Sequence, residues 1–315
     1  MASIRKFNQK IFNKMFGKGS KISDSVNVQD QNGTTGLIWA ITNDCPEYAL
    51  RMLNDDNLNV NILDKNNKSA LDYTYDKVKK MSHLKKYVDI AVKIVKHKTF
   101  DTNTTCYISY ELDEYETIKY KQEGTDANII FKILGNSLDR SDYVPVFLAL
   151  CDRHDVKINS KYRTYDGEYQ TPIAYVLTSA FYNFNTAHKI TSKILSIENV
   201  IIDNNILKYL GIDISIKILD LLLKLPNIDV NVIVGESSPI LFWLIDNNSI
   251  VYQSNNDDTN NEINKNIAKI IIDNPNFNPN AKNENDKTYL YEASNNNRND
   301  IVEMLLKNKN INIDN

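Results

Sequence analysis

The chain has 315 residues, of which 42% are hydrophobic, and a formal net charge of -3 from 37 basic and 40 acidic side chains. This length allows two or three domains, or one long array of repeats with a large buried core. The balanced charge excludes the broad positive field with which dedicated nucleic-acid binders gather their ligand, so no nucleic-acid partner is expected.

The cysteine count and the hydropathy pattern bear on the compartment. The three cysteines, Cys45, Cys106 and Cys151, are too few and too scattered for a disulfide framework, which favours a reducing compartment. No apolar run is long enough to span a bilayer and no secretory signal is visible, so a cytoplasmic protein without a membrane partner is expected.

Asparagine makes up about one residue in seven, far above ordinary usage. Isoleucine, lysine and tyrosine are also abundant, and all four have codons rich in A and T. Biased codon usage therefore explains the asparagine content without a chemical role for its side chain.

The first 24 residues form a basic N-terminal cap or arm. They contain six lysines or arginines and no acid before Asp24, and Ile4, Phe7, Ile11 and Met15 share one helical face. Three interpretations stay open: a cap over the first helix pair, a flexible basic arm, and a membrane-surface or targeting helix.

The stretch "NGTTGLIWA" over 32–40 permits two interpretations. Two glycines around two threonines could form a loop whose backbone N–H groups hold a phosphate. They could equally form a turn into a helix, with Thr35 as the N-cap.

Helices with apolar residues at three- and four-residue spacing are predicted along the rest of the chain. They cover 47–53, 89–95, 126–134, 143–151, 215–225, 266–273 and 300–307. Pro145 is tolerated in the first turn of its helix. The low-complexity stretch 253–266 is expected to be an insertion between two helices.

A short phrase of alternating polar and apolar residues, which we call the closing segment, recurs after most of these helices. It occurs at 25–29, 57–61, 99–103, 155–159, 199–203, 227–231, 276–280 and 310–314. Turn, helix, helix and closing segment form a unit of about 33 residues, and such units must stack to bury a continuous core. The units span about 25–59, 60–103, 104–159, 160–203, 204–231, 232–280 and 281–315. Whether the unit 204–231 holds a complete helix pair stays open.

These units resemble the ankyrin repeats, which open with Gly-x-Thr-Pro-Leu-His-x-Ala. Thr288, Leu290 and Ala293 match that phrase in the last unit, and Thr171-Pro172-Ile173 and Ser238-Pro239-Ile240 keep its Thr/Ser-Pro start. In the first unit, Gly33, Thr35, Leu37 and Ala40 fall into register, with Gly36 in the proline position. The resemblance implies an all-α solenoid of about six to seven helix-pair repeats.

The sequence departs from the family at the histidine of the opening phrase. The residues found there are Ile38, Asp72, Ala174, Leu241 and Tyr291. The hydrogen bond that this histidine usually makes between loops is therefore absent, and less regular loops are expected.

The segment 105–122 is predicted to be a β-hairpin. Its two halves, 105–112 and 116–122, alternate polar with apolar or aromatic residues around a polar turn. In the ankyrin register it is an enlarged finger loop, inserted between one unit's second helix and the next unit's first.

No pattern of catalytic or ligand-binding residues emerges, so no enzyme activity, cofactor or metal is expected. The Cys151–His154 pair has no second pair at zinc-finger spacing, and we expect a core cysteine beside an exposed histidine. An enzyme with a site hidden in 99–165 stays a remote alternative.

The resemblance implies a non-enzymatic scaffold or adaptor that binds an unidentified protein through its finger loops and first helices. The candidate residues are Asp30, Gln31, Asn32, Thr34, Lys65, Asn66, Lys68, Tyr107, Tyr110, Tyr115, Tyr120, Lys161, Tyr162, Arg163, Tyr165, Glu284, Asn285 and Lys287. The residue bias is similar to that of ankyrin-repeat proteins of giant DNA viruses of amoebae, with social amoebae as an alternative source. Action in the host cytoplasm follows if the protein is viral. A structural part of a larger assembly is the second hypothesis, and a monomer is favoured.

Overall fold

The computed structural model describes residues 26–80, 84–106, 127–163, 168–179, 183–210, 216–234, 238–246 and 257–313. The described chain is mainly helical, with three short two-stranded sheets, which confirms the predicted predominance of helix. It divides into two compact units, Met1–Pro172 and Ile173–Asn315.

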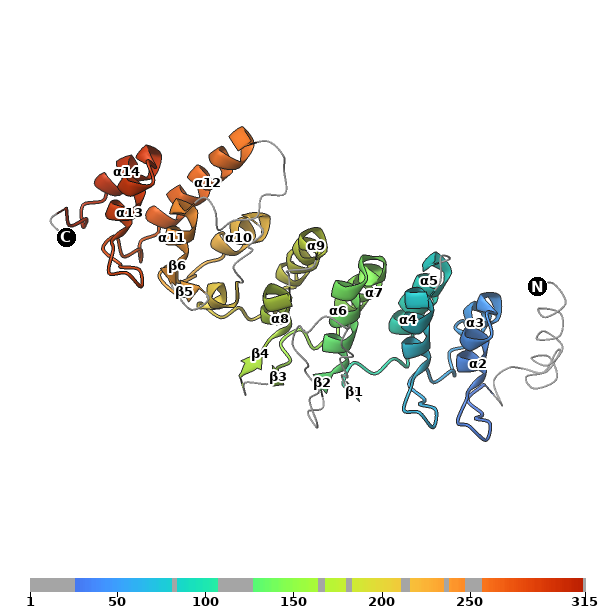
Figure 1. Ribbon diagram of the computed structural model, residues 1–315. Coiled ribbons are helices and arrows are strands. Elements are labelled where there is room, and N and C mark those ends of the chain that lie inside the picture. Colours follow the sequence, from blue (N-terminus) through green and yellow to red (C-terminus); the bar gives the residue numbers. More distant parts are fainter. Residues whose placement is uncertain are drawn as a thin grey trace. The chain divides into compact units, whose positions relative to one another are not determined.

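The first unit contains three helix pairs (Figure 1). Their helices are α2 (Gly36–Thr42) with α3 (Pro46–Met52), α4 (Ala70–Lys80) with α5 (Leu84–Lys96), and α6 (Ile129–Asp139) with α7 (Val144–Cys151). A 3-10 helix, η2 (Ser141–Tyr143), joins the last two. Helix α2 packs on α4, α3 on α5, and α5 on α7, so the core runs continuously through the unit.

Helix starts in this unit follow from capping chemistry. The Thr35 hydroxyl accepts a hydrogen bond from the Ile38 N–H at 3.2 Å, which confirms Thr35 as the predicted N-cap of α2. Asn128 caps α6 in the same way through Ile130, at 3.0 Å. Pro145 lies in the first turn of α7, where its missing N–H costs no hydrogen bond. The opening "NGTTGLIWA" is therefore a turn and a helix start.

The described part of the second unit contains helices of less uniform length, from six residues in α11 to 16 in α12 (Figure 1). Its helices are α8 (Pro172–Ser179), α9 (Phe184–Leu195), η4 (Ile206–Tyr209), α10 (Ile216–Leu223), α11 (Ile240–Ile245), α12 (Asp257–Ile272), α13 (Tyr289–Asn295) and α14 (Asn299–Leu306). Helix α10 packs on α9 and α12, α11 on α13, and α12 on α14. Only a 3-10 helix precedes α10 among the described residues of 204–231, so this helix pair is shortened.

One expectation about the second unit is wrong. The stretch 253–266 was expected to lie between two helices, yet α12 begins at Asp257 and includes most of it. The stretch has no glycine or proline to stop a helix, and it leads directly into the buried Ile267 and Ile271. A helix that is packed at one end can extend through residues of low helix propensity, because each added residue gains a backbone hydrogen bond.

Short antiparallel pairings precede the first helix of several pairs. The strands β1 (Thr105–Cys106) and β2 (Ala127–Asn128) pair before α6, β3 (Tyr162–Arg163) and β4 (Tyr169–Gln170) before α8, and β5 (Ile233–Val234) and β6 (Ser238–Pro239) before α11. Single bridges, Gln29 with Thr35 and Lys282 with Thr288, take this place before α2 and α13. Of the hairpin predicted at 105–122, only 105–106 is described, and its partner strand β2 lies beyond the predicted hairpin. The predicted pairing of 105–112 with 116–122 stays a prediction, and the N-terminal cap or arm also lies outside the described residues.

Four asparagines, which we call the asparagine ladder, bind backbone groups of the closing segment that follows. Each side-chain amide donates to a carbonyl oxygen and accepts from the N–H two residues further on, at 2.5 to 3.0 Å. The bridges join Asn27 to Asn57 and Asn59, Asn61 to Thr99 and Asp101, Asn231 to Asn276 and Asn278, and Asn280 to Asn310 and Asn312. The expectation that the asparagines need no chemical role is therefore wrong for these four.

Cationic side chains cap the C-terminal ends of neighbouring helices. Arg153, after α7, donates to the carbonyl oxygen of Val95 in the last turn of α5 at 2.9 Å, and to those of His97 at 3.2 Å and Phe100 at 3.3 Å, which follow the helix. It also binds Asp155 at 2.8 Å, and this guanidinium lowers the pKa of the Asp155 carboxyl. These contacts satisfy carbonyls that have no partner within their own helix.

The same arrangement occurs elsewhere in each unit. Lys77 on α4 donates to the Thr42 carbonyl at the end of α2, at 2.9 Å. In the second unit, Arg298 donates to the Leu244 carbonyl of α11 at 2.6 Å and binds Asp300 at 3.1 Å. Side chains that bind the backbone therefore fix loops at the ends of both first and second helices.

Candidate functional site

Three turns share one hydrogen-bond pattern and contain most of the predicted binding residues: 30–34, 64–68 and 283–287. In each, the side chain of the first residue accepts from the N–H groups of the third and fifth residues, at 2.8 to 3.1 Å. The fourth residue has a positive φ, +76° at Gly33, +56° at Asn67 and +60° at Asp286. Glycine, asparagine and aspartate adopt this left-handed conformation most readily. The expectation of less regular loops is wrong for these three turns.

The pattern separates residues that build the turns from residues that are free to face a ligand. The side chains of Asp30, Asp64 and Asn283 hold the turns together, so Asp30 has a structural role in addition to its candidate one. The other predicted residues of the turns are exposed or half-buried. The exposed ones are Gln31, Asn32, Lys65, Asn66, Glu284 and Asn285, and the half-buried ones are Thr34, Lys68 and Lys287.

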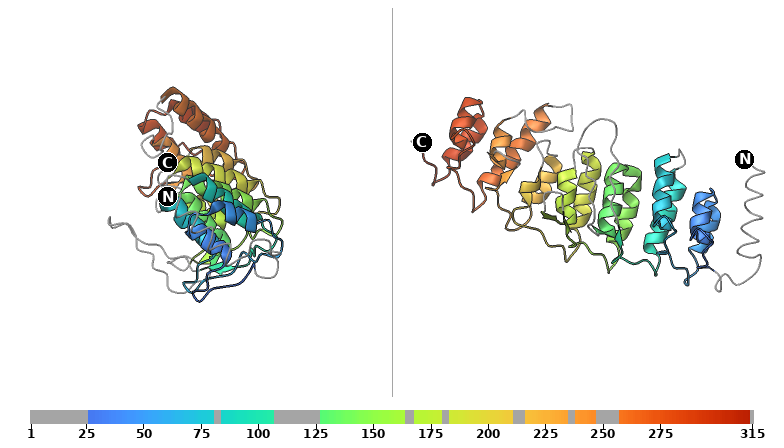
Figure 2. Two further views of the ribbon diagram at one scale, coloured as in Figure 1. Left: turned by 90° about the vertical axis from the view of Figure 1, so that its right-hand side faces the viewer. Right: turned by 60° about the horizontal axis from the view of Figure 1, so that its bottom comes forward.

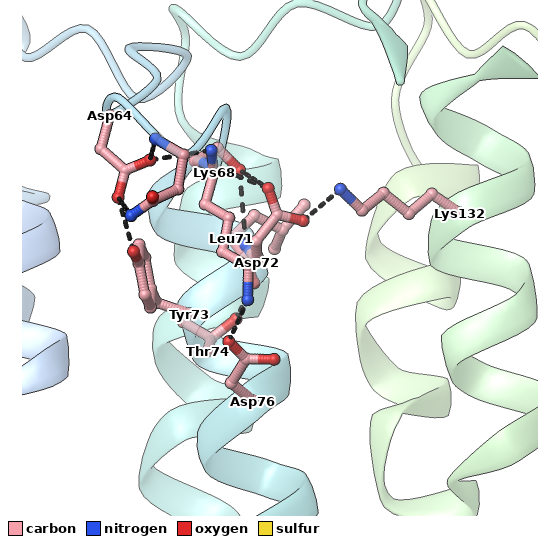
Figure 3. Close-up of polar contacts among 10 residues, drawn as sticks. Asp64, Lys68, Leu71, Asp72, Tyr73, Thr74, Asp76 and Lys132 are labelled. Atoms are coloured by element: carbon pink, nitrogen blue, oxygen red, sulfur yellow. Dashed lines mark hydrogen bonds and ion pairs between the residues drawn. The ribbon is translucent and has the colours of Figure 1, made fainter. Parts of the chain in front are cut away.

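The turn 64–68 is fixed to the helix that follows it (Figure 3). The Tyr73 hydroxyl donates to the Asp64 carboxylate at 2.5 Å, and the Lys68 ammonium binds Asp76 at 2.8 Å while lying 5.5 Å from the centre of the Tyr73 ring. Burial and the Asp64 carboxylate raise the pKa of Tyr73, and the Asp76 carboxylate raises the pKa of Lys68. These contacts place an aromatic ring and a cation beside the tip of the turn.

Burial opposes ionisation of Asp64, but the hydrogen bonds from Tyr73, Lys68 and Asn66 outweigh it and lower the pKa of this carboxyl. The carboxylate therefore stays ionised at neutral pH, and its oxygens accept the hydrogen bonds of the turn.

The start of α4 connects the turn to α6. The Asp72 carboxylate accepts from the N–H of Ser69 at 2.8 Å and from its hydroxyl at 2.9 Å, a capping-box arrangement. The other oxygen of Asp72 forms an ion pair with Lys132 of α6, as Figure 3 shows. The Asp72 carboxylate thus fixes the start of α4 and connects it to α6.

The turn 283–287 in the second unit repeats these contacts with other residues. The Asn283 amide donates to Glu292 at 3.0 Å, nine residues along the chain, just as Asp64 and Tyr73 lie nine residues apart. The Lys287 ammonium lies 4.3 Å from the centre of the Tyr291 ring. The tyrosine is 48% exposed.

Two aromatic residues on the first helices were absent from the predicted set. Tyr73 and Trp39 each lie nine residues after the first residue of their turn, and both are half-buried. Trp243 on α11, by contrast, is buried, at 7% exposure. The repeated spacing from the turn could have identified both. We call the exposed and half-buried residues of the first two turns, with Trp39 and Tyr73, the tip surface.

The predicted residues near β3 and β4 separate into two groups. Lys161 and Arg163 are exposed, but Tyr162 is 8% exposed and packs against Phe131, with 5.4 Å between ring centres. Tyr162 is therefore a core residue, and its prediction as a surface residue is wrong. The alternation along a strand turns it inward between two outward neighbours.

The remaining predicted residues are aromatic and lie outside the described residues. They are Tyr107, Tyr110, Tyr115, Tyr120 and Tyr165.

The described chain shows no grouping of metal-binding side chains at the Cys151–His154 pair or elsewhere. Cys151 is buried at the end of α7 and His154 is exposed, as expected for a core cysteine beside a loop histidine. Within the described ranges, no three His, Cys, Asp or Glu side chains come together as a group able to hold a metal ion. The helices of those ranges include none with the length and apolar character to cross a membrane.

Comparison of the sequence with models of protein families and with curated proteins finds no match.

Proposed function

We propose that the chain is a divergent ankyrin-repeat protein, a non-enzymatic scaffold that binds another protein through its tip surface. The observation that supports this proposal most is the recurrence of one turn before α2, α4 and α13, each with an identical hydrogen-bond pattern. A turn, a helix pair and a bridging closing segment together match the unit that the ankyrin resemblance implies. Stacked units of this kind present successive turns on one face.

The composition of the tip surface suits protein recognition. Trp39 and Tyr73 are large amphipathic side chains on neighbouring helices, and tryptophan, tyrosine and arginine dominate the energetics of protein interfaces. The polar tips around them, including Gln31 and Lys65, form a rim that can set specificity. The loops project from the same end of α2 and α4 (Figure 2).

The residue bias makes amoebal cells a reasonable source of the partner, with the protein acting in their cytoplasm. We suggest chemical cross-linking of the chain in an amoebal lysate, identification of the captured protein, and measurement of its dissociation constant with purified components.

A double variant of the turns tests the face used. It contains Gln31→Glu and Lys65→Glu. The matched control makes equal charge changes at exposed positions of second helices, with Asn185→Glu and Lys96→Glu. We expect the turn variant to bind at least roughly tenfold more weakly and the control to bind as the parent does. Equal affinity of the parent and the turn variant would exclude the turns as the binding face.

A further inference from the structure

Three neighbouring second helices of the second unit carry or adjoin two lysines each. Helix α10 packs on α9 and on α12 (Figure 1). All of these lysines are exposed except Lys193, which is half-buried. We call the six of them the lysine surface: Lys189 and Lys193 on α9, Lys217 on α10, Lys224 directly after α10, and Lys265 and Lys269 on α12.

Lysines of the neighbouring helices α9 and α10 lie at matching positions. Lys189 and Lys217 each lie six residues before the last residue of their helix. Lys193 follows Lys189 by four residues and Lys224 follows Lys217 by seven, so each pair shares one side of its helix. The two helices therefore present their cations side by side.

The charge of one helix acts on the next. Burial and the Lys217 ammonium of α10 lower the pKa of His188 on α9, and they outweigh the Asp220 carboxylate, which raises it. Helix α9 itself contains no acidic residue. The local potential between α9 and α10 is therefore positive, although the chain as a whole has a net charge of -3.

Most of the lysine surface is not neutralised by the protein. Lys224 pairs with Asp220 at 2.6 Å. Four others form no ion pair with any described residue: Lys189, Lys217, Lys265 and Lys269.

The first unit treats its lysines differently. Carboxylates of neighbouring helix pairs bind Lys77, Lys79, Lys86 and Lys98, at 2.6 to 3.8 Å. Like charges that lie close together without such partners repel one another, and a surface of one sign attracts ligands of the other. The contrast between the units therefore indicates an anionic ligand for the lysine surface.

We propose that the lysine surface binds an acidic segment of a partner protein, which lies extended across α9, α10 and α12. Axes of packed helices are about 8–10 Å apart, and an extended chain advances about 3.3 Å per residue. Acidic residues three positions apart therefore reach successive helices. Lysine ammonium groups are compact charges that bind carboxylates without a fixed geometry. This partner is independent of the one proposed for the tip surface.

The other side chains of the three helices favour this ligand over a nucleic acid or a membrane. Among their described positions, the exposed side chains include no arginine and no aromatic residue, the types that read base edges or stack on bases. These positions also include no exposed large apolar residue that could insert into a bilayer. Charge alone binds a membrane weakly, because stable attachment needs a second signal.

Fluorescence anisotropy of a labelled peptide tests the proposal with the full 315-residue chain. The peptide repeats Glu-Gly-Ser four times, so that glutamate recurs at every third position. We expect the parent chain to bind it, and the affinity to fall as salt screens the charges. The double variant Lys189→Glu, Lys217→Glu should bind at least roughly tenfold more weakly.

The matched control is Lys86→Glu with Lys98→Glu. It makes the same charge change at exposed lysines of the first unit that already pair with Glu47 and Asp56, and it should bind the peptide as the parent does. A parent chain that does not bind the peptide, or a control that loses as much affinity as the double variant, would overturn the proposal.

Two other anionic ligands test the class of partner. Vesicles containing phosphatidylserine and a short DNA duplex should each bind at least roughly tenfold more weakly than the peptide does. Tighter binding of either ligand, lost in the double variant, would assign the lysine surface to that ligand and overturn the proposal. Circular dichroism of every variant checks that folding is retained.

Discussion

The first unit uses polar side chains in two different ways. On the tip surface, ion pairs such as Lys68–Asp76 join side chains that stay 44% and 35% exposed. On the side of the closing segments, Asn61 and Arg153 bind backbone groups of another segment, and the Arg153 side chain is only 13% exposed. Exposed side-chain pairs stabilise a fold weakly, whereas less exposed side chains that bind backbone groups of another segment stabilise it more strongly. The tip surface can therefore vary with its ligand while the contacts to the closing segments maintain the fold.

The largest effect is expected at Arg153. Arg153→Ala removes donors from the carbonyls of Val95, His97 and Phe100 and leaves Asp155 without its cation, which should lower the free energy of unfolding by about 3 kcal/mol. Urea unfolding followed by circular dichroism measures this loss. Arg140→Ala is the control, because its pair with Asp142 spans 3.6 Å between partly exposed side chains and should contribute below about 1 kcal/mol. Equal losses at both arginines would contradict the conclusion that an arginine bound to backbone carbonyls stabilises the fold more than an exposed ion pair does.

The next effect is expected in the asparagine ladder. Asn61→Ala leaves the Thr99 carbonyl and the Asp101 N–H without this partner, and we expect a loss of about 2 kcal/mol in the same assay. Asn57→Ala serves as the control because the bridge uses the backbone carbonyl of Asn57, which the substitution retains. If the control lost as much as Asn61→Ala, the bridge would not explain the stability.

A smaller effect is expected at Asp72, in the first turn of α4 beside the tip surface. Asp72→Ala removes the capping contacts with Ser69 and the ion pair with Lys132, in which the two side chains are only 11% and 25% exposed. We expect a loss of about 1 kcal/mol, compared with less than about 0.5 kcal/mol for Asp76→Ala. A larger loss at Asp76 would show that the more exposed pair is the more important one for stability.

The smallest loss, with a distinct pH signature, is expected for Asp64→Asn. Asparagine occupies this position in the turn 283–287 and supplies the same acceptor oxygen, so we expect a loss of at most about 0.5 kcal/mol at pH 7. The folded-state pKa of Asp64 is lowered, so its ionisation stabilises the fold above the unfolded pKa of about 3.9. This contribution disappears as the pH falls through the folded value.

The difference in stability between parent and Asp64→Asn should therefore shrink below about pH 4. Urea unfolding at a series of pH values measures it. A difference that does not change with pH would contradict the role assigned to the carboxylate.

Local patterns predicted much of the secondary structure. Apolar spacing identified α5, α10 and α14, and the Thr35 cap and the Pro145 position followed from helix-end chemistry. These features depend on neighbouring residues, which a sequence displays directly. The start of α12 was missed because its boundary depends on packing and not on a stop signal.

Features that join distant segments were not predicted. The asparagine ladder joins residues 30 to 47 positions apart, and no local pattern distinguishes its asparagines from the many others. Within the candidate site, the turns were located correctly. The sequence did not show which of their side chains form the hydrogen bonds that hold the turns together. Tyr162 was misplaced because two charged neighbours conceal its inward direction, although strand alternation could have indicated it.

The asparagine ladder also affects how such a chain can change during evolution. Each ladder amide contacts only the peptide groups of the segment that it binds, and every residue type except proline supplies those groups alike. The ladder contact can therefore be kept when a helix pair is duplicated, lost or exchanged, without a compensating substitution in the bound closing segment, provided that the backbone path is kept. For the same reason, the helix pairs can diverge in sequence while the asparagine contact to the following closing segment stays the same.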